Sequence, residues 1–221
     1  IGALIGSIIG GKISSARRGG FQQSFAQSQQ IFVISLVILT AKLAKADGHV
    51  SKEELIAIKQ KLKVPDNEID QVGKIFNKAT EDSLGYEPYA KQIAQIYQNK
   101  PAVLDEVINI LFYIAEADGK VSNSELAMIK NIAQIFNLTD IQFEGIKESR
   151  KGSDKLNPYV VLGCNSNDDF ATIRKKYIQL SKEHHPDALI SKGVPKEVID
   201  ESKKKMRAIN SAFDKIEKMQ S

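Results

Sequence analysis

Three consecutive residues, His185, Pro186 and Asp187, place an imidazole, a rigid backbone and a carboxylate together between two predicted helices. Proline fixes the local backbone torsion, and an aspartate can accept charge-assisted hydrogen bonds from an arginine of another protein. His184 adds a second imidazole, but no third metal ligand or nucleophile stands nearby in the sequence. We therefore interpret the tripeptide as a recognition element, assign His184 to packing, and expect no enzyme.

Four basic residues precede the tripeptide on the same predicted helix: Arg174, Lys175, Lys176 and Lys182. They lie outside the apolar stripe of that helix, as the charged residues of a solvated face commonly do. Beside an exposed His-Pro-Asp turn, they also predict a positively charged docking surface for an acidic protein partner.

Four carboxylates occupy equivalent positions in an internal repeat, which reads LAKADGHVSKEEL at residues 43–55 and IAEADGKVSNSEL at residues 114–126. They are Asp47, Glu54, Asp118 and Glu125. Carboxylate oxygens are ligands that Ca²⁺ and Mg²⁺ prefer, so two copies packed about a pseudo-two-fold axis would form a joint divalent-cation site. Each copy alone lacks the earlier oxygen ligands of an EF-hand loop, so we expect no independent EF-hand site.

The repeat also has a structural explanation. Gly48 and Gly119 can adopt the left-handed conformation that ends a helix. The motif S-x-x-E, which begins at Ser51 and again at Ser122, has the spacing of a capping box that begins the next helix. The repeat therefore predicts the same unit of helix, tight turn and helix twice, with or without a cation.

Composition and apolar periodicity favour an all-α fold. Leu, Ile, Ala, Lys and Glu dominate, tryptophan is absent, and the single cysteine, Cys164, excludes an intramolecular disulfide. Apolar helices are predicted at residues 31–46 and 102–117, and amphipathic helices at residues 51–62 and 122–136. The uncharged part of the first apolar run is too short to span a bilayer, so we expect a buried core helix there.

The C-terminal part has the pattern of an antiparallel helical hairpin. A short helix ends at Gly163, and Asn167 or Asp168 is expected to cap a second helix that runs to His184. A third helix opens near Pro195, and apolar side chains recur at spacings of three and four residues on both long helices. The hairpin places the His-Pro-Asp turn at its tip.

Residues 1–20 are rich in glycine and carry a small-xxx-small pattern at Gly2, Gly6 and Gly10. This spacing lets membrane helices approach closely, so it predicts the end of an N-terminal membrane anchor and a homodimer contact through the three glycines. The run is too short to cross a bilayer, so the anchor would need residues before residue 1. The basic residues that follow would then lie on the cytoplasmic side. A flexible glycine-rich leader is the alternative.

The middle of the chain, residues 25–150, resembles the TerB-like domains of tellurite-resistance proteins through its two ADG-x-V-S-x-x-E-L elements. The resemblance implies an all-helical domain with an internal duplication and a role in metal binding or scaffolding. Residues 151–155 are the predicted linker, because the polar stretch around them is interrupted by glycine and proline.

Residues 156–221 resemble a J domain, the module of the DnaJ co-chaperone family, through YVVLG, IRKKYIQLSKEHHPD and MRAINSAFDKI in that order. The resemblance implies that His185, Pro186 and Asp187 stimulate ATP hydrolysis by a DnaK-type chaperone, and that the basic residues of the preceding helix help to dock it. Combined with a TerB-like domain, this J domain is similar to that of the membrane-anchored DnaJ-like co-chaperones. Ile178, Gln179 and Ala188 depart from the family pattern, in which basic residues are usual at the first and last of these positions.

The predicted protein is an all-α TerB-like domain with an internal duplication, followed by a C-terminal J-domain hairpin. Its predicted function is that of a co-chaperone, held at the cytoplasmic face of the inner membrane by a single N-terminal anchor. The alternative is a divalent-cation-binding TerB-like scaffold of a stress response, and no other cofactor is expected. Nucleic acid is not an expected partner, because the lysines of the last helix are interspersed with acidic residues.

Overall fold

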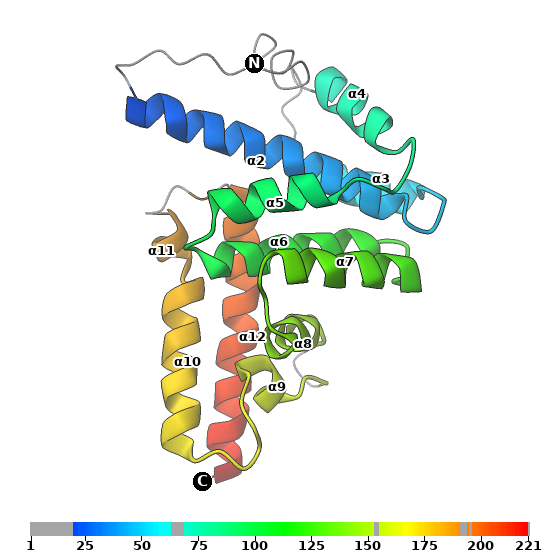
Figure 1. Ribbon diagram of the computed structural model, residues 1–221. Helices are drawn as coiled ribbons and strands as arrows, with labels where there is room; N and C mark the ends of the chain where they lie inside the picture. Colours follow the sequence, from blue (N-terminus) through cyan, green and yellow to red (C-terminus); the bar gives the residue numbers. More distant parts are fainter. Residues whose placement is uncertain (1–19, 63–68, 153–154, 191–193, 195, 221) are drawn as a thin grey trace.

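The computed structural model describes residues 20–62, 69–152, 155–190, 194 and 196–220. Within these ranges every regular element is a helix and none is a strand (Figure 1), which confirms the predicted all-α fold. None of the helices in these ranges combines the length and the apolar character that crossing a bilayer requires. The predictions for Gly2, Gly6, Gly10 and the basic residues after them lie outside the described residues.

The first part of the chain is a bundle of helices packed around α2 and α6. In chain order the helices are α2 (Gly20–Ala44), α3 (Lys52–Leu62), α4 (Ile69–Ala79), α5 (Glu87–Ile96), α6 (Pro101–Ala115), α7 (Asn123–Ile135) and α8 (Asp140–Ser149). The predicted core helix is part of α2, where every side chain from Ser35 to Ala44 is buried. Nearly all side chains of α6 are buried as well, including several polar ones.

Both copies of the internal repeat form the predicted helix, turn and helix. The first copy joins α2 to α3, and the second joins α6 to α7. Gly48 and Gly119 have φ angles of 92° and 94°, the left-handed values that side chains with a Cβ rarely adopt. In each copy, the serine and the glutamate of the S-x-x-E motif exchange backbone and side-chain hydrogen bonds, which is a capping box. The structural explanation of the repeat is therefore confirmed.

The second part of the chain forms the predicted short helix and hairpin. Its helices are α9 (Pro158–Leu162), α10 (Phe170–His184), α11 (Pro186–Ile190) and α12 (Lys196–Gln220). Gly163, with a φ angle of 64°, ends α9 as predicted. The predicted cap of α10 is wrong: Asp169, and neither Asn167 nor Asp168, accepts the hydrogen bond from the backbone N–H of Thr172. Asp168 instead accepts a backbone hydrogen bond within the preceding turn, so the helix begins later.

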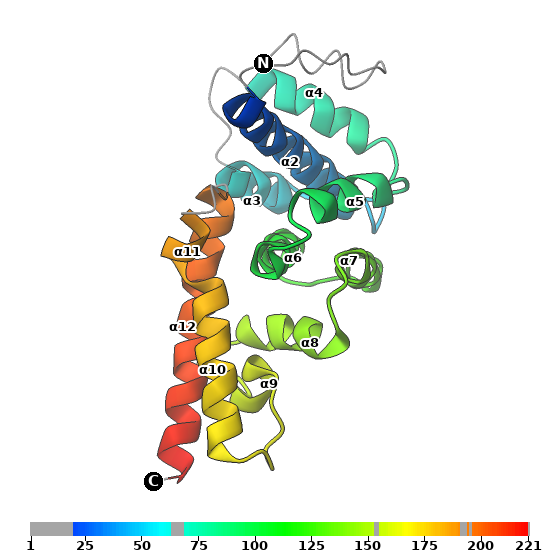
Figure 2. The ribbon, with the colours of Figure 1, turned by 60° about the vertical axis from the view of Figure 1, so that its left-hand side comes forward.

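Helices α10 and α12 lie side by side in Figures 1 and 2 and form an antiparallel hairpin. The rings of Tyr177 on α10 and Phe213 on α12 stack with their centroids 4.1 Å apart. Ile173, Ile209 and Ile216 are completely buried between the two helices and α9. The apolar stripes read from the sequence therefore face each other.

The loop end of the hairpin packs against the first part of the chain. Figures 1 and 2 show α11 and the start of α12 beside the helices of the first part, whereas the C-terminal end of α12 points away. Leu189, Val194 and Val198 belong to the same cluster of buried apolar side chains as the cores of α2 and α6. The two parts of the chain thus share one core at the end of the hairpin that carries the His-Pro-Asp turn.

Candidate functional site

The His-Pro-Asp turn stands at the junction of α10 and α11. His185 ends α10 in an extended backbone conformation, and Pro186 begins α11. The backbone N–H of Asp187 donates a hydrogen bond of 3.2 Å to Nδ1 of His185. The side chains of His185 and Asp187 are 53% and 85% exposed, and their Nδ1 and Oδ2 atoms lie 3.8 Å apart. Both polar side chains are therefore exposed on a backbone held by the proline and by this local hydrogen bond.

Three of the four predicted docking cations share the exposed surface of α10. Arg174, Lys175 and Lys182 are exposed, and spacings of four residues place Arg174, the exposed Ile178 and Lys182 along one helix face. Lys176 differs, because it is only half-exposed and lines a cavity of about 210 Å³ between α6, α8, α9, α10 and α12. The structure thus presents a positive face on α10 that leads to the His-Pro-Asp turn, with Lys176 at its inner edge.

His184, one residue before the exposed turn, is buried against two acids of α6. Its Nδ1 lies 3.0 Å from Oε1 of Glu106, and its Nε2 lies 3.5 Å from Oδ2 of Asp105. The three side chains are 1%, 0% and 9% exposed in the order His184, Glu106, Asp105. Burial alone would lower the pKa of His184, but hydrogen bonding to both carboxylates and their negative charge raise it to about 9. His184 is therefore a buried cation at neutral pH. Its predicted packing in the interior is confirmed, and its neighbours there are two carboxylates.

Lysines of α3 and α12 extend this polar contact along the hairpin. Lys205 is buried, and its Nζ lies 3.4 Å from both the backbone oxygen of Gly145 and Oγ of Ser149. Burial lowers the pKa of Lys205, and the charges of Asp105 and Glu106 partly oppose that shift. One turn nearer the start of α12, the buried Glu201 pairs with Lys61 of α3 and with Lys204. Ionic contacts between the two parts of the chain therefore accompany the shared apolar core.

The repeated carboxylates lie near one another and take part in local hydrogen bonds. Glu54 and Glu125 belong to the capping boxes, whereas Asp47 and Asp118 each accept a hydrogen bond from the backbone N–H two residues further on. Burial raises the pKa of Glu54 and of Glu125; hydrogen bonds from Ser51 or Ser122 oppose this, and the negative charge of Asp47 adds to it in both cases. The proximity predicted for the two copies is thus present. In the part of the chain that the structure describes, however, no three His, Cys, Asp or Glu side chains are grouped so that they could hold a metal ion.

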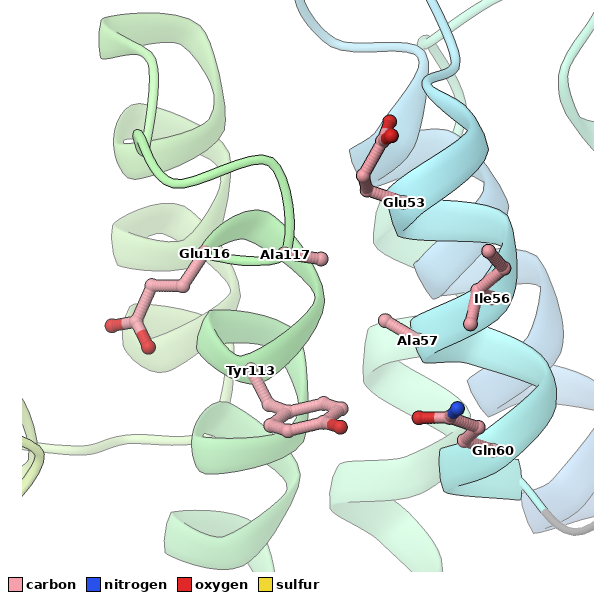
Figure 3. Close-up of a pocket in the computed structure, with 7 residues that line it drawn as sticks. All are labelled: Glu53, Ile56, Ala57, Gln60, Tyr113, Glu116 and Ala117. Atoms are coloured by element: carbon pink, nitrogen blue, oxygen red, sulfur yellow. The ribbon is translucent and has the colours of Figure 1, made fainter.

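A surface cleft of about 410 Å³ lies between α3 and α6 (Figure 3). Its lining consists of Glu53, Ile56, Ala57, Gln60, Tyr113, Glu116 and Ala117. Figure 3 shows the ring of Tyr113 directed toward α3 and the carboxylate of Glu116 turned away from it. Glu116 is paired with Arg150, and the lysine nitrogens of Lys61 and Lys204 lie 4.9 Å and 5.0 Å from the centre of the Tyr113 ring. Glu116 and Tyr113 thus take part in contacts between helices, and we assign no chemistry to this cleft.

Sequence reasoning did not single out Asp105 and Glu106 as partners of His184, nor Lys205 as a second cation near these acids. One signal was present: Asp105 and Glu106 interrupt the apolar run of residues 102–117, and charged residues are rarely buried unless they are paired. Their partner could not be read from the sequence, because 78 positions separate Glu106 from His184.

Comparisons with known proteins agree with this two-part architecture. The family model described as Tellurite resistance protein TerB matches residues 33–148, and the DnaJ domain model matches residues 157–220. No solved structure matches the chain.

Three relatives named Co-chaperone protein DjlA align along nearly the whole chain. The protein of Coxiella burnetii is 25% identical to it, and the alignment covers 100% of this chain and 92% of the relative. The protein of Photorhabdus laumondii is 24% identical, with coverages of 98% and 90%. The protein of Vibrio vulnificus is 27% identical, with coverages of 95% and 89%. The chain therefore belongs to the TerB family, carries a DnaJ domain at its C-terminal end, and over its length is similar to the co-chaperones named DjlA.

Proposed function

We propose that this protein is a co-chaperone that stimulates ATP hydrolysis by a DnaK-type chaperone and has no enzymatic activity of its own. The observation that carries the proposal is the exposed His-Pro-Asp turn at the end of a helix whose outer face is basic, within a segment that matches the DnaJ domain. The names of the relatives support the same assignment.

The turn would act by binding one state of the chaperone more tightly than the other. Arg174, Lys175 and Lys182 attract an acidic surface of the chaperone, and Asp187 accepts hydrogen bonds from an arginine there. Stimulation requires that these contacts are stronger in the hydrolysis-competent state than in the resting state, because a ligand shifts an equilibrium only through its differential affinity. The groups that cleave ATP belong to the chaperone.

Steady-state ATP hydrolysis by a DnaK-type chaperone tests this proposal. We expect the wild-type chain to accelerate hydrolysis and Asp187→Asn to abolish the acceleration, because the amide removes the charge but keeps the size of the side chain. Asp214→Asn is the matched control, since Asp214 is also an exposed aspartate of the hairpin but lies on α12 near the C-terminus. Equal stimulation by all three chains would refute the assigned role of the turn.

We also propose that the chain is attached to the cytoplasmic face of the inner membrane through its N-terminal segment. The support is the glycine spacing of Gly2, Gly6 and Gly10, with basic residues directly after it. Membrane fractionation of cells that express the natural chain should place it in the carbonate-resistant pellet. Recovery in the carbonate-soluble fraction would contradict the anchor.

Divalent-cation binding by the TerB-like part is a second candidate function. The observation that favours it is that carboxylates of the two copies lie close together: burial is the main cause of the raised pKa of Glu125, and the negative charge of Asp47, in the other copy, adds to it. Calorimetric titration with Ca²⁺ and Mg²⁺ should then show saturable binding that is lost in Asp47→Asn combined with Asp118→Asn. A titration without saturable heat would remove this candidate and leave the repeat a structural role alone.

A further inference from the structure

The segment that carries the His-Pro-Asp turn is held on both sides by the TerB-like part. Directly before the turn, His184 contacts Asp105 and Glu106 of α6. After it, Leu189 and Val194 are buried in the apolar cluster built by α2, α6 and their neighbours. The turn is thus an exposed stretch between two buried attachments.

The polar attachment depends on groups from both parts of the chain. Buried carboxylates are costly unless they are paired and hydrogen-bonded. Glu106 accepts one hydrogen bond from Asn109 on its own helix, at 3.0 Å, and its other oxygen contacts His184. Asp105 contacts His184 through Oδ2, while Oδ1 has no hydrogen-bond partner. The cations that face these two acids, His184 and Lys205, both come from the hairpin.

Loss of His184 and Lys205 would leave two buried carboxylates on the largely apolar surface of α6 without a cation. The J-domain hairpin therefore packs against α6 and supplies the cations that pair with its buried acids; it is not attached through the linker alone. Because His184 is adjacent to His185, its orientation fixes where the chain enters the exposed turn.

We propose that Asp105 and Glu106 are positioning residues, which hold His184 and thereby fix the orientation in which His185, Pro186 and Asp187 meet a DnaK-type chaperone. This inference rests on the proposed co-chaperone function. It assigns to the TerB-like part a direct role in presenting the turn.

The expected effect on ATPase stimulation depends on the fraction of molecules that hold the turn in the orientation that binds the chaperone. Apparent affinity falls in proportion to this fraction, while the complex that does form is unchanged. A weakened contact should therefore raise the concentration that gives half-maximal ATPase stimulation and leave the maximal rate the same. If the competent fraction falls to about one fifth, the half-maximal concentration rises about five-fold.

The test compares Glu106→Gln and Asp105→Asn in the full chain, each of which removes charge with little change in shape. Glu81→Gln is the matched control, because Glu81 is an exposed acid that pairs with Lys78 and lies far from the hairpin in the sequence. Each variant is titrated against a DnaK-type chaperone at fixed pH and salt. Proton–nitrogen NMR of the imidazoles of His49, His184 and His185, the three histidines of the chain, shows whether the His184 contact is retained.

Either α6 variant should raise the half-maximal concentration about five-fold with the same maximal rate. It should shift the imidazole resonances of His184 and, because the turn is reoriented, those of His185, while those of His49 stay unchanged. The control should match the wild type in both measurements. A shifted His184 resonance with an unchanged half-maximal concentration would overturn the positioning role while the co-chaperone function stands. No stimulation by the wild-type chain would overturn both. If one α6 variant does not fold, the other supplies the same comparison.

Discussion

An increase in pH should destabilise this protein through one buried side chain, His184. The pKa of His184 is raised from its usual 6.5 to about 9 because hydrogen bonds and charge from Asp105 and Glu106 outweigh the effect of burial. A shift of one pKa unit corresponds to about 1.4 kcal/mol, so the charged histidine contributes roughly 3 kcal/mol to the free energy of unfolding. For a chain of this length, that corresponds to a change of roughly 6 to 12 °C in melting temperature.

The direction of this pH effect depends on whether the folded or the unfolded chain binds the His184 proton more tightly. The folded chain holds the His184 proton to a higher pH than the unfolded chain does, so the contribution is complete below about pH 6.5 and disappears as the pH rises through about 9. Lys205 acts in the opposite direction, because its pKa is lowered in the folded chain and its release of a proton at alkaline pH relieves a cost. A variant without His184 is therefore needed to separate the two effects.

Urea unfolding, followed by circular dichroism between about pH 6 and 10, measures this contribution. The wild-type chain should lose about 3 kcal/mol more across the range than His184→Gln does. His185→Gln applies the same chemical change to the exposed neighbour and should follow the wild-type profile. If His184→Gln and the wild type show parallel profiles between pH 6.5 and 9, the reasoning about the charged histidine is refuted.

Two further substitutions test the docking face and the repeat. Ile178→Lys adds a cation to the exposed face of α10 that already carries basic residues four positions away on both sides. It should lower the half-maximal concentration for ATPase stimulation about two- to five-fold at low salt, an effect that added salt removes. The same change at the exposed Ile69 of α4 is the control, and an equal effect at both positions would contradict a specific docking face. Gly119→Ala should lower the free energy of unfolding by about 1 kcal/mol or more. The cause is backbone strain, because φ is 94° at Gly119 and no atom lies within 4 Å of an added Cβ. Gly152→Ala is equally uncrowded and has no positive φ, so it should be nearly neutral in urea unfolding, and a similar loss of stability in both variants would exclude strain as the reason.

Much of the local structure was predictable because its causes lie within a few residues of one another. The glycines at positive φ and the S-x-x-E capping boxes identify the turn of each repeat from adjacent residues alone. Apolar spacings of three and four predict which faces of α10 and α12 meet. The cap of α10 shows where local reasoning reaches its limit, because Asn167, Asp168 and Asp169 are all acceptable caps and the hydrogen bonds of the preceding turn select the last.

The sequence by itself determined the helices, the duplicated unit and the chemistry of the His-Pro-Asp turn, since each depends on backbone preferences and side chains that are neighbours along the chain. Only the tertiary structure decided that the turn is fastened to the TerB-like part. The acids Asp105 and Glu106 become acceptable inside an apolar helix when His184 and Lys205 supply charge from a distant segment. The physical reason is that the free energy of a buried charge depends on the groups that contact it in the folded chain. No local pattern of residues specifies which distant side chains these will be.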